Sequence, residues 1–288
     1  MTEIILTGTG CPIPDPDRAG PGVLVRTGTL ALQFDAGRAT TMRLAAAGVA
    51  SGDLNASFIT HHHSDHIVGL PDVVMSRWIN PHLNRDQPLT IVTPAGEGAT
   101  IVAHMLDPWH NELANRADHT GRTTRPAIDL HAFKPSGELE VVWERDGVRV
   151  SAIAVHHEPL VPAVAYRVDS GDGSVVISGD TRICDEVERA ARGADVLVHE
   201  AMRKNLYRRN GAEADGEHPV LSYHSDTTEL GALACRAGVG TLILTHLLPP
   251  PKEERHVQGF ITDVRAGGFE GPVVVGADMH RHVLAGKE

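Results

Sequence analysis

Candidate metal ligands are concentrated between positions 61 and 66, where four histidines and an aspartate occur: His61, His62, His63, Asp65 and His66. Imidazole nitrogens and carboxylate oxygens suit zinc or a similar divalent ion. His61 and His63 are two positions apart on a loop and can point to one side. Asp65 and His66 are adjacent to each other and face elsewhere, which offers a second pair of ligands. The alternative, a solvated loop or a helix cap by Ser64 or Asp65, accounts poorly for four imidazoles, so the stretch predicts a metal site.

This stretch lies on a loop between an expected strand and an expected helix. In the first half we expect strands at 4–7, 22–26, 30–34 and 57–60, and helices at 36–47, 67–78 and 97–113. In the second half we expect strands at 138–144, 148–155, 163–168, 174–178, 195–199, 241–245 and 272–276, and helices at 184–192, 227–237 and 252–266. The polar stretch 115–126 is expected to be an exposed loop. Two groups of strands, each followed by helices, predict a single four-layer αβ/βα sandwich over residues 1–288, with two mixed β-sheets flanked by helices.

The composition indicates a globular protein of the cytoplasm. The 288 residues are 41% hydrophobic, and the three cysteines form no C-x-x-C pair, so neither a disulfide framework nor a cysteine zinc site is expected. The N-terminus does not resemble a secretory signal, and no apolar stretch approaches the ~18 residues of a membrane span. The formal net charge of −11 opposes binding of a polyanion unless a local basic patch outweighs it.

The spacing of the first ligands matches the H-x-H-x-D-H motif, so the sequence resembles the metallo-β-lactamase superfamily. That family has a third histidine after a later strand, for which His157 fits better than its neighbour His156. It also has a bridging aspartate on a glycine turn, matched by Asp180, and a histidine that ends a late strand, matched by His246. The resemblance covers nearly the whole chain.

The resemblance implies a dinuclear metal centre. One ion would be held by His61, His63 and His157, the other by Asp65, His66 and His246, with Asp180 bridging the two. The expected ions are two Zn²⁺, with manganese or iron as alternatives. A water between two such ions loses a proton near neutral pH and becomes the nucleophile. We also expect Asp35 to hold the histidine loop by hydrogen bonds.

Two further segments resemble the branch that contains ribonuclease Z and the zinc-dependent arylsulfatases. The segment around His199 and Glu200 resembles a HEAT-type motif, and His224 stands where that branch carries H-S-T. The resemblance implies that His224 contacts the phosphate or protonates the leaving group, and that Glu200 orients it. Asp226 and Glu229 form a capping-box pattern that opens the helix 227–237.

Two departures argue against a tRNA substrate. Only residues 158–179 separate the third histidine from the bridging aspartate, so the long tRNA-binding arm of many ribonuclease Z enzymes is missing there. The ending Thr245-His246-Leu247-Leu248-Pro249-Pro250 also differs from T-H-x-S-x-R-Y. A basic cluster at Arg203, Lys204, Arg208 and Arg209 fits phosphate contacts or a solvated face equally well. The polar segment 80–137 is expected to form a substrate wall or an interface.

The leading interpretation is therefore a dinuclear zinc hydrolase in which hydroxide on the metals attacks a phosphodiester or aryl sulfate ester of a small anionic substrate. Its catalytic residues would be Asp65, His224 and Glu200. The alternative is a tRNA 3′-processing endoribonuclease of the ribonuclease Z type. A lactonase or β-lactamase, or an inactive metal-binding scaffold, fits less well. Relatives in this branch imply a homodimer.

Overall fold

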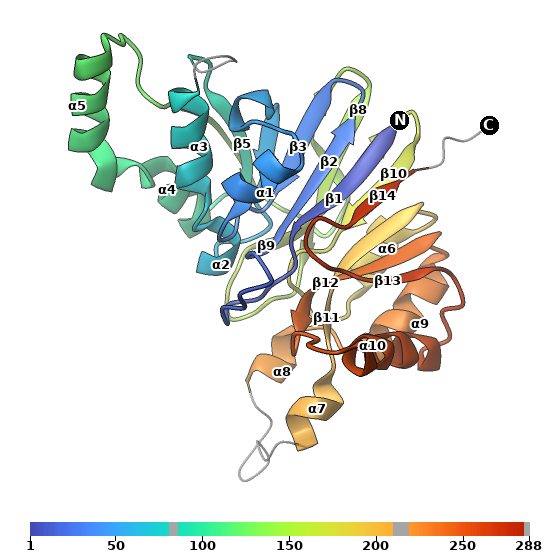
Figure 1. Cartoon of the computed structure of the whole chain (residues 1–288). Helices are drawn as coiled ribbons and strands as arrows, with labels where there is room; N and C mark the ends of the chain where they lie inside the picture. Colours follow the sequence, from blue (N-terminus) through green and yellow to red (C-terminus); the bar gives the residue numbers. More distant parts are fainter. Residues whose placement is uncertain (81–85, 210–218, 285–288) are drawn as a thin grey trace.

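The computed structural model describes residues 1–80, 86–209 and 219–284. Within them, two seven-stranded sheets pack face to face, and helices cover their outer faces (Figure 1). This arrangement confirms the predicted four-layer αβ/βα sandwich. No helix in the described part of the chain is long and apolar enough to span a membrane.

The first sheet has the strand order β14-β1-β2-β3-β4-β5-β6. Its strands are β1 (Thr2–Gly8), β2 (Gly22–Thr27), β3 (Leu30–Phe34), β4 (Ala56–Phe58), β5 (Leu89–Pro94), β6 (Ile128–Phe133) and β14 (Arg281–Val283). The pairs from β14 to β3 are antiparallel, whereas β3 to β6 run parallel. The outer face is covered by α1 (Thr40–Ala46), α3 (Leu70–Ile79) and α4 (Glu97–His104).

The second sheet has the order β13-β12-β11-β10-β9-β8-β7. Its strands are β7 (Glu140–Arg145), β8 (Val148–Val155), β9 (Ala163–Ser170), β10 (Gly173–Ile177), β11 (Val196–Met202), β12 (Thr241–Leu248) and β13 (Val273–Val275). The strands β10 to β13 run parallel, and β7 to β10 are antiparallel. The outer helices are α6 (Asp185–Ala191), α9 (Thr227–Ala237) and α10 (Glu254–Ala266).

Alternation along the strands builds a core on each side of each sheet. In β1, Ile4 and Leu6 lie in the core between the sheets, while Ile5 packs beneath the helices of the first sheet. Every residue of β11 is buried, because this central parallel strand is covered on both faces. Its apolar residues are therefore consecutive on either side of the buried pair His199 and Glu200.

The segment 80–137 differs most from its expectation. It contributes two strands that the sequence did not predict, β5 and β6, which complete the first sheet; its expected role as a substrate wall or an interface stays a prediction. The expected helix 97–113 is divided, because Pro108 lies in a 3₁₀ turn, Asp107–Trp109, between α4 and α5 (His110–Thr120). The expected loop 115–126 begins within α5, which packs on α3 through Leu113, Ala117 and Trp78.

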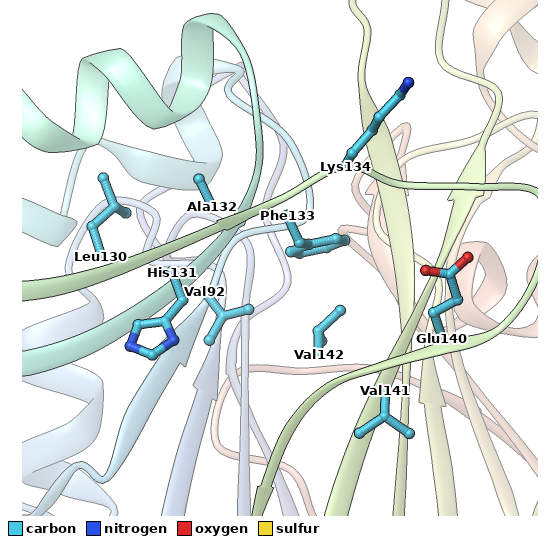
Figure 2. A pocket seen from close by; sticks show the side chains of 9 residues that line it. All are labelled: Val92, Leu130, His131, Ala132, Phe133, Lys134, Glu140, Val141 and Val142. Carbon is cyan, nitrogen blue, oxygen red and sulfur yellow. The ribbon is translucent and has the colours of Figure 1, made fainter.

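The edge strands β6 and β7 lie next to each other at one end of the sandwich (Figure 2). Phe133 from β6 and Val142 from β7 pack against the core between the sheets. A cavity of about 500 Å³ lies between these two strands. None of the residues that line it belongs to the predicted metal centre, which lies elsewhere in the molecule.

Candidate metal centre

Strand ends bring together the side chains that the sequence predicted as ligands. The loop after β4 carries His61 and His63, and the short helix α2 (Ser64–Ile67) carries Asp65 and His66. From the second sheet, the residues that follow β8 and β10 or end β12 join them: His157, Asp180 and His246. Crevices at the carboxyl ends of parallel strands are the usual ligand sites of α/β sheets.

A bulge in β12 aims His246 at this cluster. The pairing of β11 with β12 shifts register so that His246 has no partner between Thr245 and Leu247. Its φ angle of 45° lies in the left-handed region, which is uncommon for a residue other than glycine. Bulges of this kind redirect a side chain at the edge of an active site.

The first group of side chains consists of His61, His63 and His157. Nδ1 of His63 lies 3.1 Å from Nε2 of His61 and 3.1 Å from Nε2 of His157. Burial and the nearby His157 lower the pKa of His63 to about 4. Burial and the neighbouring His66 also hold the pKa of His61 well below its ordinary value. These imidazoles are therefore neutral at pH 7 and carry lone pairs that a cation can share.

The second group consists of Asp65, His66 and His246. Oδ2 of Asp65 lies 3.6 Å from Nε2 of His66 and 3.4 Å from Nε2 of His246. These three atoms are buried without a hydrogen-bond partner among the described residues. Buried polar atoms are normally paired, so three that converge without partners fit a divalent cation held between them.

Asp180 lies between the two groups. Its Oδ2 atom is 3.3 Å from Nε2 of His66 and 3.2 Å from Nε2 of His246. The same oxygen lies 3.9 Å from Nε2 of His61 and 4.0 Å from Nε2 of His157. A single carboxylate oxygen therefore faces both groups.

Asp35 braces the histidine loop, as the sequence predicted. Its Oδ2 atom lies 2.7 Å from Nδ1 of His66 and accepts a 2.8 Å hydrogen bond from the Thr60 hydroxyl. Its Oδ1 atom accepts the Thr60 amide, and the same threonine hydroxyl lies 3.0 Å from Nδ1 of His61. These contacts fix the rings of two predicted ligands, which is how outer-shell groups tune metal sites.

The structure separates the predicted ligands from their neighbouring histidines. His157 faces the cluster and donates from Nδ1 to the main-chain oxygen of Tyr223 at 3.0 Å. His156 lies outside, where its ring contacts the carboxylates of Glu158 and Glu186. His62 approaches Glu97 instead of the cluster, at 3.7 Å.

His224 and Glu200 form a pair beside the second group. Nδ1 of His224 lies 3.0 Å from Oε1 of Glu200, which also accepts hydrogen bonds from the amides of Thr181 and Ser225. Burial alone would lower the pKa of His224, but the Glu200 carboxylate and its hydrogen bond outweigh burial, and the pKa is raised. His224 follows α8 (Val220–Tyr223) and stands before the cap of α9.

A cavity of about 510 Å³ opens beside the cluster. One side is formed by site residues, including His63, Asp65 and His224. The other side is apolar and contains Cys11, Pro12, Ile13, Val220, Tyr223 and Leu248. Sequence reasoning missed this wall, although the position of Tyr223 next to His224 was a signal that could have identified it. The other wall residues lie in the N-terminal loop, in α8 and at the end of β12, and no motif marks them.

The predicted basic cluster does not gather at this cavity. Arg203 is bound to Asp263, with its Nε atom 2.6 Å from Oδ2, and its guanidinium lies over the Phe260 ring. Arg203 and Lys204, the two members whose side chains the structure describes, do not line the cavity. The side chains of Arg208 and Arg209 lie outside the described part of the structure.

The fold and the histidine–aspartate cluster define a metal-dependent hydrolase with the metallo-β-lactamase fold. Residues 2–211 match the family model described as "Anti-Pycsar protein Apyc1". Over 285 residues the chain is 40% identical to a protein named Ribonuclease Z from Mycobacterium bovis, strain BCG / Pasteur 1173P2, with 98% of each chain covered. The chain belongs to the metallo-β-lactamase superfamily, in its ribonuclease Z-like branch, as the sequence predicted.

Solved structures support the same fold. The metallo-β-lactamase fold protein YhfI from Bacillus subtilis superposes with a TM-score of 0.73 at 20% identity, with 98% of both chains covered. The short form of human tRNase Z superposes with a TM-score of 0.69 at 19% identity, covering 98% of this chain and 99% of that one.

Proposed function

We propose that this chain is a phosphodiesterase that cleaves precursor tRNA at its 3′ end, the alternative that the sequence had placed second. The observation that carries the proposal is the arrangement of two ligand groups around Asp180 with the His224–Glu200 pair alongside. We propose that the first group and the second group each hold one ion, with zinc as the expected metal. The name Ribonuclease Z, carried by relatives of 37% to 40% identity, supports an RNA substrate, and the sequence resemblance to that branch implies tRNA.

The side chains of the site have different roles in the proposed hydrolysis. The chemistry that divalent ions supply when bound is a water of lowered pKa and neutralisation of charge on the phosphate oxygens. The oxygen of water adds to phosphorus as the water releases one proton to solvent, and the bond from phosphorus to the ribose 3′ oxygen breaks. His224, held by Glu200, donates the proton that this leaving oxygen takes up. Asp65, as a member of the second group, and Asp180, which lies between the two groups, would each contribute a carboxylate oxygen that holds metal.

The short connection between the third histidine and Asp180 does not count against this proposal. Residues 158–179 form β9, a turn and β10, so they contain no arm, as the sequence indicated. However, the matched relative named Ribonuclease Z is covered along 98% of its own length by an alignment of 285 residues, so it has about the same length as this chain. A chain of this size is thus compatible with that name.

A small phosphodiester or aryl sulfate is the second candidate, and the cavity favours it. None of the described residues that line the cavity is a lysine or an arginine. A surface that grips a polyanion needs several basic contacts, whereas a single ester group can be bound by the metal centre alone. The formal net charge of −11 also opposes binding of a polyanion and therefore favours the small substrate.

One panel of substrates separates these candidates. The purified protein, loaded with zinc or with manganese, is assayed on precursor tRNA, a bis-aryl phosphodiester, an aryl sulfate, a cyclic nucleotide and a lactone. We expect precursor tRNA to be cleaved at its 3′ end with the highest kcat/KM and the activity to disappear in His66→Ala. Faster hydrolysis of a small ester than of tRNA would transfer the assignment to the second candidate. No hydrolysis of any phosphodiester or sulfate would reject both.

We also propose that residues 1–288 act as one hydrolase domain in the cytoplasm and that the protein is a homodimer. Light scattering of the purified chain measures its mass in solution, for comparison with the 30.8 kDa protomer. Elemental analysis of protein purified without added metal identifies the ion and its stoichiometry. Two equivalents of zinc per chain are expected.

A further inference from the structure

The cavity beside the metal centre has two chemically different halves. Its polar half belongs to the site, whereas its apolar half has no charged side chain among the described residues. At about 510 Å³ the cavity falls within the range of small-ligand sites, which is roughly 300–1,000 Å³. A phosphodiester bound at the metal centre would therefore place a neutral, largely apolar substituent against the second half.

Two basic side chains near this half, in the described part of the chain, bind other protein groups. Arg38 donates from NH2 to the main-chain oxygens of Cys11, at 2.8 Å, and Pro12, at 3.2 Å. Lys252 forms an ion pair with Asp15 in the same N-terminal loop. These contacts hold the loop in place but offer no cation to a second phosphate. The wall therefore selects against additional charge next to the scissile group.

Tyr223 is the aromatic residue of this wall. Its ring centroid lies 4.9 Å from that of His224 and 5.1 Å from that of His157, tilted in the first case and edge-on in the second. The side chain is half-buried, and its hydroxyl has no hydrogen-bond partner among the described residues. The ring therefore stands next to the proton donor and within the cavity.

The wall around Tyr223 is already packed in the free protein. Cys11, Met202, Leu221 and Leu248 form a buried cluster against which Val220 packs. Because α8 is anchored by Leu221, the tyrosine that ends this helix is held before any substrate arrives. A rigid aromatic surface binds a planar ring with little loss of side-chain entropy.

We propose that Tyr223 is a specificity-determining residue that stacks with the aromatic ring of the alcohol leaving in hydrolysis, a nucleobase or an aryl group. We assign the stacked ring to the leaving alcohol because Tyr223 adjoins His224, which in the proposed function donates a proton to the leaving oxygen. The inference rests on the proposed phosphodiesterase function and names the substrate class of that site. Base–aromatic stacking has about the strength needed to change kcat/KM tenfold or more.

The test compares two dinucleotides that differ only in the leaving nucleoside, which is adenosine in one and an abasic riboside in the other. Their kcat/KM values are measured by chromatography for the wild type, Tyr223→Phe and Tyr223→Leu. We expect a preference for adenosine of about tenfold or more in the wild type and in Tyr223→Phe, and close to none in Tyr223→Leu. In Tyr223→Leu, the decrease in kcat/KM for the adenosine dinucleotide should come mainly from a higher KM.

A purely structural role of Tyr223 gives a different result. In that case Tyr223→Leu lowers kcat/KM for both dinucleotides equally and leaves their ratio unchanged, which overturns the proposal. A wild-type ratio near one overturns it as well. The bond from His157 to residue 223 uses the main-chain oxygen, so the substitutions leave it in place, and equal metal content of the three proteins confirms an intact centre.

A binding measurement separates this inference from the proposed function. Phosphonate analogues, in which a methylene group replaces the leaving oxygen, are titrated calorimetrically into the same proteins. If the wild type binds the adenosine analogue more tightly than the abasic one, and Tyr223→Leu does not, the stacking site is supported. This holds even if neither dinucleotide is hydrolysed, because a lack of hydrolysis would reject only the proposed function. Equal affinity for the adenosine and abasic analogues in the wild type overturns the inference.

Discussion

At the scale of single residues, the centre combines donor atoms that lack partners with outer groups that are fully engaged. Oδ2 of Asp65 and Nε2 of His66 are buried and make no hydrogen bond among the described residues, whereas Asp35 uses both carboxylate oxygens to hold Thr60 and His66. This contrast is typical of a cation site: the buried Asp65 and His66 atoms can bind an ion, and the hydrogen bonds of Asp35 orient the side chains that carry such atoms.

Replacing Asp35 by asparagine should weaken metal binding. The amide has no charge to support His66 and cannot accept through both of its terminal atoms, so we expect metal affinity to fall by about 10- to 100-fold. Competition against a chelating dye measures the dissociation constant. Asp129→Asn changes an exposed aspartate in β6 and is the matched control. Equal affinity in Asp35→Asn and in the control would contradict the bracing role.

Replacing Glu200 by glutamine tests the orientation of His224. The carboxylate raises the pKa of His224, so its loss should lower that pKa and make the proton donor unavailable at a lower pH. The alkaline limb of the pH profile of kcat should therefore move to lower pH. At neutral pH we expect kcat to fall by about 100-fold. Glu270→Gln, at an exposed glutamate, should leave both quantities unchanged; an unshifted limb in Glu200→Gln would refute the positioning role.

At the scale of elements, short irregular pieces between regular ones position the site. The bulge at His246, the single turn α2 and the cap of α9 each fix one part of it. Asp226 caps α9 by accepting the amides of Thr228 and Glu229, as the sequence predicted. The residue that precedes this cap by two positions is His224, so the start of the helix and the proton donor are placed together.

Removing the cap should destabilise the protein. In Asp226→Ala the amides of Thr228 and Glu229 lose their acceptor, so we expect the free energy of unfolding to fall by about 1 kcal/mol. Urea denaturation of the metal-loaded protein measures the change. Asp226→Ser keeps a capping oxygen and should recover most of the stability. A loss of equal size in both variants would show that capping is not the cause.

At the scale of the whole molecule, the metal centre lies where the two sheets meet. The predicted ligands come from the first sheet through the loop after β4, and from the second through β8, β10 and β12. An ion bound by residues from both halves links the sheets, and it can bind only when the chain is folded. Metal binding is therefore coupled to the stability of the whole fold.

Removing metal should lower the melting temperature. An ion present at 100 times its dissociation constant stabilises the folded state by about 2.7 kcal/mol, so chelation should lower Tm and added zinc should restore it. Calorimetry with and without chelator measures this shift. His156→Ala, at the histidine outside the cluster, should keep the full shift, and His66→Ala should lose most of it. The same shift in His66→Ala as in the wild type would contradict the assignment of His66 as a ligand.

The sequence alone determined the fold class, the positions of most strands and the residues that meet at the centre. Most strands are short apolar runs bounded by turn residues, and the candidate ligands stand at or near strand ends. β8 and α9 have the bounds that the pattern predicted. The strands β5 and β6 within the segment 80–137 were not predicted, because polar residues surround them and their burial depends on neighbouring strands and helices far away in the sequence.

Only the tertiary structure decided how the candidate residues are arranged in space. Local spacing could not show that a bulge turns His246 inward, that Asp180 faces both ligand groups, or that His157 points in where His156 points out. It also could not assemble the apolar wall, because Pro12, Val220 and Leu248 are joined only by packing. Ligand identity follows from side-chain chemistry and order along the chain, whereas the shape of the substrate site follows from contacts between distant segments.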